Sequence, residues 1–229
     1  MSLKGLFNAR WPGVALFDLD GTLVDSAPDL AAAVDRMLEH LGRAPAGLDQ
    51  VRQWVGNGAA ILVRRALAGR IDWQPATPRD DALFQDALAI FYHHYGQLNG
   101  QHARVFPGVT DCLAHLEAHG CRLAVVTNKP GPFVAPLLER VGLARWFELS
   151  VAGDTLPVKK PDPAPLLHAM TQLGGTRGTT VMVGDSAADV NAAQAAGIPC
   201  VAVRYGYNFG QPVDALGADA VVDSLTELL

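Results

Sequence analysis

The chain has 229 residues, of which 49% are hydrophobic and 18% are charged, and its formal net charge is −5. This composition is that of an ordinary globular protein and gives no sign of disorder. The negative charge and the lack of a dense run of lysine or arginine argue against nucleic-acid binding. No stretch resembles a signal peptide or reaches the roughly 20 apolar residues of a membrane span, so we expect no membrane partner.

The cysteine content indicates a reducing compartment. Cys112, Cys121 and Cys200 form no Cys-x-x-Cys pair and leave one cysteine over. Neither a zinc site nor a disulfide framework is therefore indicated. We expect a soluble protein of the cytoplasm, and the choice between a monomer and a homodimer stays open.

Short apolar runs typical of buried parallel strands recur along the chain. They span residues 14–17, 123–127, 148–152, 180–184, 199–203 and 220–222. Helical stretches lie between them at residues 108–119, 133–141, 163–173 and 187–196, each followed by a glycine that suits a helix C-terminus. This alternation predicts an α/β fold with a doubly wound, Rossmann-type parallel sheet.

The segment from about residue 27 to residue 103 breaks the alternation, because it has helical patterns and no convincing strand. Its apolar residues fall on helical stripes, namely Leu30, Val34, Met37, Leu38 and Leu41, then Ile61, Leu62, Arg65 and Ala66, then Leu83, Ala87, Ile90 and Phe91. We expect an inserted helical-bundle domain at 27–103, and a core domain made of residues 1–26 and 104–229.

The sequence Asp18-Leu19-Asp20-Gly21-Thr22 follows the first predicted strand directly. Open α/β sheets bind their ligands at the carboxyl ends of strands, and alternation sends Asp18 and Asp20 toward the same side. One carboxylate could attack a substrate while the other transfers protons. Taken alone, the segment fits a strand-end turn equally well, whereas an EF-hand is excluded because Leu23 occupies the glycine position of that loop.

Three further polar clusters follow later predicted strands. Thr127 and Asn128 could donate hydrogen bonds to phosphoryl oxygens, although a threonine in this position is usually a turn residue. Lys160 could neutralise charge on an attacking carboxylate and on a phosphate. Because strand ends share one edge of the sheet, we expect these residues beside Asp18.

The third cluster runs from Gly184 to Asp189 and contains two more carboxylates. Asp185 would lie close to Asp18, so the pair needs a cation to offset its repulsion. Magnesium is expected, since two or three carboxylates without histidine or cysteine are ligands that it prefers. Asp189 lies behind them, and its Ser-x-x-Asp spacing from Ser186 also fits a helix capping box.

Together these motifs resemble those of the haloacid dehalogenase superfamily. All four motifs are present in order, namely Asp18 to Thr22, Thr127, Lys160, and Gly184 to Asp189. Further segments are similar to the bacterial phosphoglycolate phosphatase family, namely 18–29, 55–59, 126–130 and 205–208. The resemblance covers essentially the whole chain.

The resemblance implies a specific mechanism. Asp18 would attack phosphorus and form an aspartyl-phosphate, and Asp20 would protonate the leaving alkoxide and then activate water. Mg²⁺ would be held by the carboxylates of Asp18 and Asp185 and by the main-chain carbonyl of Asp20. Lys160 and Thr127 would hold the phosphoryl oxygens. The expected substrate is a small phosphate ester, 2-phosphoglycolate, which would yield glycolate and phosphate.

The helical insertion resembles the cap domain of this superfamily, which closes over the site and contacts the leaving group. Asn57 and Gly58, with the nearby Arg64 and Arg65, are candidates for binding a substrate carboxylate, although Asn-Gly pairs and surface arginines are common. A sugar-phosphate phosphatase or a hexose-phosphate mutase remains an alternative. A dehalogenase is disfavoured because it would not need Asp20, and the complete acid set argues against a non-catalytic phosphate-ester sensor.

Overall fold

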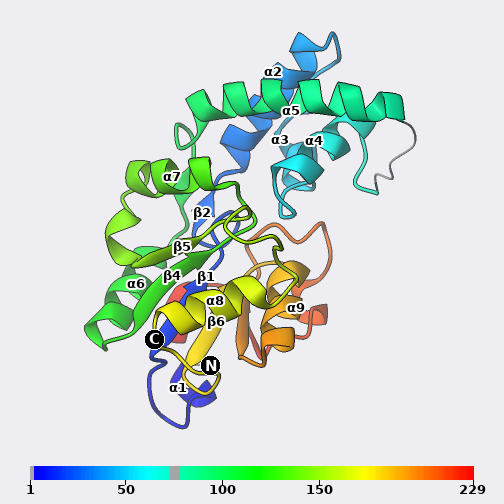
Figure 1. Cartoon of the computed structure of the whole chain (residues 1–229). Coiled ribbons are helices and arrows are strands. Elements are labelled where there is room, and N and C mark those ends of the chain that lie inside the picture. The colour runs from blue at the N-terminus through cyan, green and yellow to red at the C-terminus, as the bar shows by residue number, and fades with distance from the viewer. Residues whose placement is uncertain (1–2, 73–77) are drawn as a thin grey trace.

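The computed structural model describes residues 3–72 and 78–229. Its main sheet has six strands in the order β5-β4-β1-β6-β7-β8, and every neighbouring pair is parallel (Figure 1). The strands are β1 (Val14–Phe17), β4 (Arg122–Val126), β5 (Leu149–Val151), β6 (Thr180–Gly184), β7 (Cys200–Val203) and β8 (Ala220–Val222). The predicted doubly wound sheet is confirmed, and β1 lies between β4 and β6 near its centre.

Helices cover both faces of this sheet, which explains its uninterrupted apolar strands. Ala15 and Phe17 of β1 pack in one apolar cluster with α6 (Val109–Ala118) and α7 (Val134–Arg140). Val14 and Leu16 point to the opposite face, where α8 (Ala164–Gln172) and α9 (Ala187–Ala196) lie. Successive side chains of a strand alternate between faces, so one short run of β1 serves two cores.

Short helical segments complete this part of the chain. They are α1 (Leu3–Leu6) and the 3₁₀ turns η1 (Gly131–Phe133), η2 (Ala144–Trp146), η3 (Val213–Ala215) and η4 (Leu225–Leu228). Among the residues described, no helix combines the length and the apolar character that a membrane crossing needs.

A separate helical unit is formed by α2 (Ala27–His40), α3 (Leu48–Arg52), α4 (Ala59–Ala68) and α5 (Pro78–Leu98). It has its own apolar cluster and stands beyond one edge of the sheet (Figure 1). The buried face of α5 consists of Phe84, Ala87, Phe91, Tyr95 and Leu98. Of the stripe expected on this helix, Ala87 and Phe91 lie in the buried face, whereas Leu83 and Ile90 are only partly buried, because larger aromatic side chains occupy that face.

The chain enters and leaves the helical unit through two adjacent strands. Strand β2 (Val24–Asp25) pairs antiparallel with β3 (Arg104–Val105). The buried carboxylate of Asp29 accepts hydrogen bonds from the main-chain nitrogens of Gly100, His102 and Ala103, at 2.7, 2.7 and 3.2 Å. These hydrogen bonds hold residues 100–103, which lead from α5 into β3, against the first turn of α2.

Candidate active site

Asp18 stands directly after β1 and is held there by the sheet. Its main-chain nitrogen donates to Val183 O of β6 at 2.9 Å, and its residue is only 8% exposed. Both Asp18 and Asp20 line a pocket between the sheet edge and the helical unit, together with Thr127 and Asn128. The two carboxylates therefore do face a common space, as the alternation along the backbone predicts.

Asp20 has different partners from Asp18. Its Oδ1 accepts a 2.5 Å hydrogen bond from Ser26 Oγ, and Lys129 Nζ lies 3.0 and 3.2 Å from its two carboxylate oxygens. Asp20 is thus oriented by a hydroxyl and an ammonium group, and its carboxylate does not belong to the acidic cluster described next. Nothing tests the proposed main-chain contact of Asp20 with a metal, which stays a prediction.

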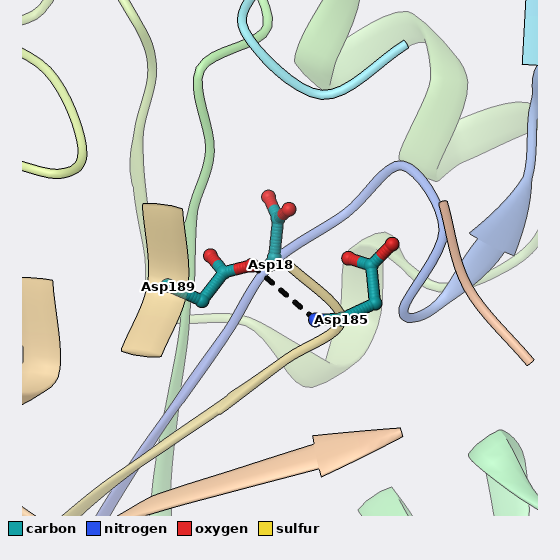
Figure 2. Close-up of side chains that lie close together, drawn as sticks. All are labelled: Asp18, Asp185 and Asp189. Carbon is teal, nitrogen blue, oxygen red and sulfur yellow. Dashed lines mark hydrogen bonds between the residues drawn. The ribbon is translucent and has the colours of Figure 1, made fainter. Parts of the chain in front are cut away.

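The acidic cluster consists of Asp18, Asp185 and Asp189, whose nearest carboxylate oxygens all lie within 4.8 Å of one another (Figure 2). Asp185 follows β6 directly, and its Oδ1 accepts from Thr22 Oγ1 at 2.9 Å. Asp189 lies in the first turn of α9 and accepts from Ser186 N and Ser186 Oγ at 3.1 and 2.7 Å. Asp189 therefore caps the helix, as its spacing suggested, while standing beside the other two acids.

The backbone around Asp185 is shaped to let this carboxylate approach closely. A Cβ atom at Gly21, where φ is +92°, would lie 2.3 Å from Asp185 Oδ2. A Cβ atom at Gly206 would lie 2.2 Å from Asp185 Cβ. Tyr207 N donates to Asp185 Oδ2 at 2.5 Å. Any side chain at either glycine would push this carboxylate out of place.

Lys160 supplies the positive charge of the acidic cluster. Its Nζ lies 2.6 Å from Asp189 Oδ1 and 3.0 Å from Asp18 Oδ1, and its side chain is 2% exposed. Burial alone would lower the pKa of Lys160, but the carboxylates of Asp18 and Asp189 outweigh it and raise that pKa. Lys160 is therefore a permanent ammonium group at this site.

The negative charge of the three carboxylates exceeds the single positive charge of Lys160. Burial, together with the nearby Asp189 carboxylate, raises the pKa of Asp18 to about 6 despite the attraction of Lys160. Burial and the charges of Asp18 and Asp189 raise the pKa of Asp185 well above its ordinary value. Three carboxylates face one ammonium group, so a divalent cation would neutralise the excess, and oxygen ligands suit a hard ion. The residues present therefore fit a metal ion, and the assignment of Asp18 and Asp185 as its carboxylate ligands stays a prediction.

The strand-end residues Thr127 and Asn128 both line the pocket. Thr127 Oγ1 accepts from Lys129 N at 3.2 Å and is buried near Asp18. Asn128 Nδ2 donates to Lys160 O at 3.0 Å and to Gly56 O at 3.5 Å, so its side chain joins three loops. Contacts of Thr127, Asn128 and Lys160 with a phosphoryl group stay predictions.

The structure separates the residues expected to bind a substrate carboxylate. Gly58 lines the pocket, but Asn57 Oδ1 instead accepts from Arg65 Nη2 at 3.0 Å. The Arg64 guanidinium lies 3.6 Å from the centre of the Phe84 ring and 3.3 Å from Asp81, and it is not among the described residues lining the pocket. Gly58 thus borders this space, whereas Asn57 is not among the described residues that line it, and a role of any of the three in substrate binding stays a prediction.

Several residues of the site were not predicted from the sequence. Lys129 and Tyr95 line the pocket, and Ser26 and Tyr207 hold Asp20 and Asp185. Lys129 follows Thr127 and Asn128 directly, so its place in a strand-end motif was a usable indication. Tyr95 had none, because it lies on one helix stripe with ordinary apolar residues.

A family model for haloacid dehalogenase-like hydrolases matches residues 13–197. The chain belongs to this family. The hydrolase is 53% identical to a phosphoglycolate phosphatase of Pseudomonas putida over 224 residues, which cover 98% of this chain and 81% of that protein. It is 49% identical over 223 residues to phosphoglycolate phosphatase 1 of Pseudomonas aeruginosa, covering 97% of this chain and 80% of the relative.

Solved structures agree with this assignment of the hydrolase. A predicted phosphoglycolate phosphatase from Haemophilus somnus superposes with a TM-score of 0.85 at 34% identity, covering 94% of this chain and 96% of the other. CbbY from Rhodobacter sphaeroides, solved in complex with phosphate, superposes with a TM-score of 0.77 at 25% identity over 95% and 96% of the two chains.

Proposed function

We propose that this hydrolase is a phosphatase acting on a small phosphate monoester, and that its substrate is 2-phosphoglycolate. The observation that carries the proposal is the position of Asp18. Its carboxylate follows the carboxyl end of the buried strand β1, borders a pocket, and lies 3.0 Å from the Lys160 ammonium group. The choice of substrate rests on the relatives named phosphoglycolate phosphatase, one of them 53% identical.

In the proposed reaction, an Asp18 oxygen attacks phosphorus while the ester P–O bond breaks. Asp20 gives a proton to the departing oxygen, which leaves as the hydroxyl of glycolate. Asp20 then accepts a proton from water, whose oxygen attacks the aspartyl-phosphate and releases phosphate. Asp18 is regenerated as a carboxylate. Lys160 and Thr127 would bind the phosphoryl oxygens.

A metal ion fits the acidic cluster, and we propose that it is Mg²⁺, held by the carboxylates of Asp18 and Asp185 and by the main-chain carbonyl of Asp20. When bound, it would offset the negative charges of nucleophile and phosphate. Asp189 would support this arrangement indirectly, because its carboxylate holds Lys160 and Ser186.

We propose residues 27–103 as a cap domain and residues 1–26 with 104–229 as the catalytic core. The separate apolar cluster of α2–α5 and the paired crossings β2 and β3 support this division. A cap that excludes water suits a reaction in which water must attack only the aspartyl-phosphate, and not before it has formed. We also propose a cytoplasmic location, which the buried, unpaired Cys112, Cys121 and Cys200 favour.

A first experiment measures phosphate release from 2-phosphoglycolate and from a panel of sugar phosphates, with Mg²⁺ and with EDTA. We expect metal-dependent turnover that is fastest for 2-phosphoglycolate and is abolished in Asp18→Asn, a change that keeps size and removes the nucleophile. Wild-type activity in Asp18→Asn would exclude the covalent route. Tight binding of phosphate esters without turnover would instead favour a sensor.

A second experiment tests the role of Asp20. The Asp20→Asn variant should hydrolyse 2-phosphoglycolate about 10²–10⁴-fold more slowly, the usual contribution of a general acid. The rate of phosphoenzyme formation from p-nitrophenyl phosphate should fall less in this variant, because p-nitrophenolate leaves without a proton. The burst of p-nitrophenol in rapid-mixing experiments reports this step. An equal loss for both leaving groups would contradict the acid role.

A further inference from the structure

Lys129 is a second buried ammonium group at the site, distinct from Lys160. Its side chain is 2% exposed, and Nζ donates to both oxygens of Asp20 and to the hydroxyl of Tyr95. Among the described residues that line the pocket, Lys129 is the one with a cationic side chain. A buried lysine is costly to keep charged, so this position calls for an explanation.

In the proposed reaction, Lys129 has no role beyond orienting Asp20. Asp18 and Asp189 pair with Lys160, which would serve the phosphoryl group, whereas Lys129 pairs with Asp20. Asp20 is the residue that must reach the ester oxygen, so Lys129 borders the part of the pocket where the leaving group would lie. Two of its three N–H groups bond one carboxylate, and one of these could turn to another anion.

We propose that Lys129 binds the carboxylate of the leaving group and thereby selects anionic esters such as 2-phosphoglycolate. This inference rests on the proposed function and names the residue that confers its substrate preference. The two anionic ends of the substrate would then each meet one buried ammonium group.

Tyr95 brings the helical unit into this contact. It lies on α5, is fully buried, and its ring centre is 4.7 Å from Lys129 Nζ. Burial raises the pKa of Tyr95 well above its usual range, so its hydroxyl keeps its hydrogen and can donate it to the same carboxylate while accepting from Lys129. The carboxylate site would therefore be complete only with α5 in place.

Two other cations near the pocket, Arg65 and Lys159, donate hydrogen bonds to main-chain oxygens. Arg65 donates to Trp54 O and Ile71 O, at 2.7 and 3.1 Å, and Lys159 Nζ donates to Asn57 O at 2.9 Å. Both groups hold the loop before α4, Arg65 also holds the segment after it, and neither is among the described residues lining the pocket.

Three esters that differ only in the leaving-group end test this proposal: 2-phosphoglycolate, 2-hydroxyethyl phosphate and 2-aminoethyl phosphate. The readout is the ratio of kcat/KM values between esters, so a general loss of activity cancels. Wild type should prefer the carboxylate ester, then the neutral one, then the ammonium one. In Lys129→Met, the preference for 2-phosphoglycolate over the neutral ester should fall by about 30-fold or more, as truncation of a buried charge pair does.

The ammonium ester reports the change of charge at this end of the pocket. Without Lys129, Asp20 faces the pocket without its cation, so 2-aminoethyl phosphate should gain relative to the neutral ester. Lys129→Arg should keep the order of preference of the wild type, and Tyr95→Phe should weaken it by raising KM for 2-phosphoglycolate alone. These two variants test the site even if Lys129→Met does not fold, which its melting curve would reveal.

Equal losses for all three esters in Lys129→Met would mean that Lys129 only orients Asp20, and would overturn the proposal. A preference for 2-phosphoglycolate that survives in Lys129→Met would overturn it as well. If wild type hydrolysed none of the three esters, the phosphatase function itself would fail, and the role of Lys129 with it.

Discussion

Lys160 Nζ lies 2.6 Å from Asp189 Oδ1, and both side chains are almost completely buried. A second ion pair in the chain has the same distance but a different environment, since Arg122 Nη2 and Glu148 Oε2 lie 2.6 Å apart with both side chains about half exposed. The two pairs separate the effect of burial from the effect of distance.

Removing one charge from each pair should therefore have unequal consequences. Asp189→Asn should lower the free energy of unfolding by about 3 kcal/mol or more, because it leaves Lys160 with one fewer counter-charge in a buried setting. Glu148→Gln should change it little, since water screens exposed pairs. Urea denaturation at pH 7 measures both variants, and equal losses would contradict this account of the acidic cluster.

Metal binding should stabilise the fold through Asp185. At a Mg²⁺ concentration of 100 times Kd, a ligand bound only by the folded state adds about 2.7 kcal/mol, which raises Tm. Asp185→Asn should lose most of this rise. Asp20→Asn should keep it, because the Asp20 side chain faces Lys129 and Ser26. Calorimetry with Mg²⁺ and with EDTA distinguishes the two variants, and a lost rise in Asp20→Asn would assign that carboxylate to the metal.

The stability of the metal-free protein should decrease as pH rises from about 4 to about 6. The pKa of Asp18 is about 6 in the fold, against 3.8 for an unperturbed aspartate, so the unfolded chain releases its proton first. A raised carboxylate pKa contributes stability below the unfolded value and loses it as pH passes the folded value. This corresponds to at most about 3 kcal/mol.

Asp18→Asn is the control for that pH dependence. It should flatten the decrease of stability with pH in EDTA, although the variant is inactive. Asp185, whose pKa burial also raises, should add a decrease of the same sign in both proteins. Urea denaturation across this pH range in EDTA gives the slopes. A wild-type slope that matches Asp18→Asn would show that Asp18 ionises normally in the fold.

Gly58 offers a test of the contact between the helical unit and the sheet edge. It precedes α4 with φ of 85° and ψ of 167°, and a Cβ atom there would lie 2.8 Å from Asn128 O. Gly47 precedes α3 with φ of 81° and ψ of 164°, and nothing lies within 4 Å of its Cβ position. The two glycines thus share a backbone conformation and differ in their surroundings.

Alanine at either glycine should cost about 1–3 kcal/mol of stability, because this backbone region is almost exclusive to glycine. Gly58→Ala should in addition raise KM for the phosphate ester, since it forces the loop before α4 away from Asn128. Gly47→Ala should leave KM unchanged. Steady-state kinetics on both variants decides this, and matching KM values would mean that the contact does not shape the pocket.

The parallel sheet and the positions of the motifs at its strand ends could be predicted from the sequence alone. Strands such as β1 and β6 are continuous apolar runs closed by acidic residues, and the carboxyl ends of parallel strands meet at one edge whatever the loops do. This is why Asp18, Lys160 and Asp185 could be expected together. The Ser186–Asp189 spacing likewise predicted a local capping contact that the structure contains.

Which partner each side chain takes depends on packing in three dimensions. Lys129 and Asp20 are 109 positions apart in two different loops, and Tyr95 contacts Lys129 from helix α5, so no local periodicity links the three. The same holds for Arg64, whose side chain settles on Phe84 rather than in the pocket. Such choices depend on how α4 and α5 pack against the sheet edge and on the cost of burying each charge, and both follow from long-range contacts.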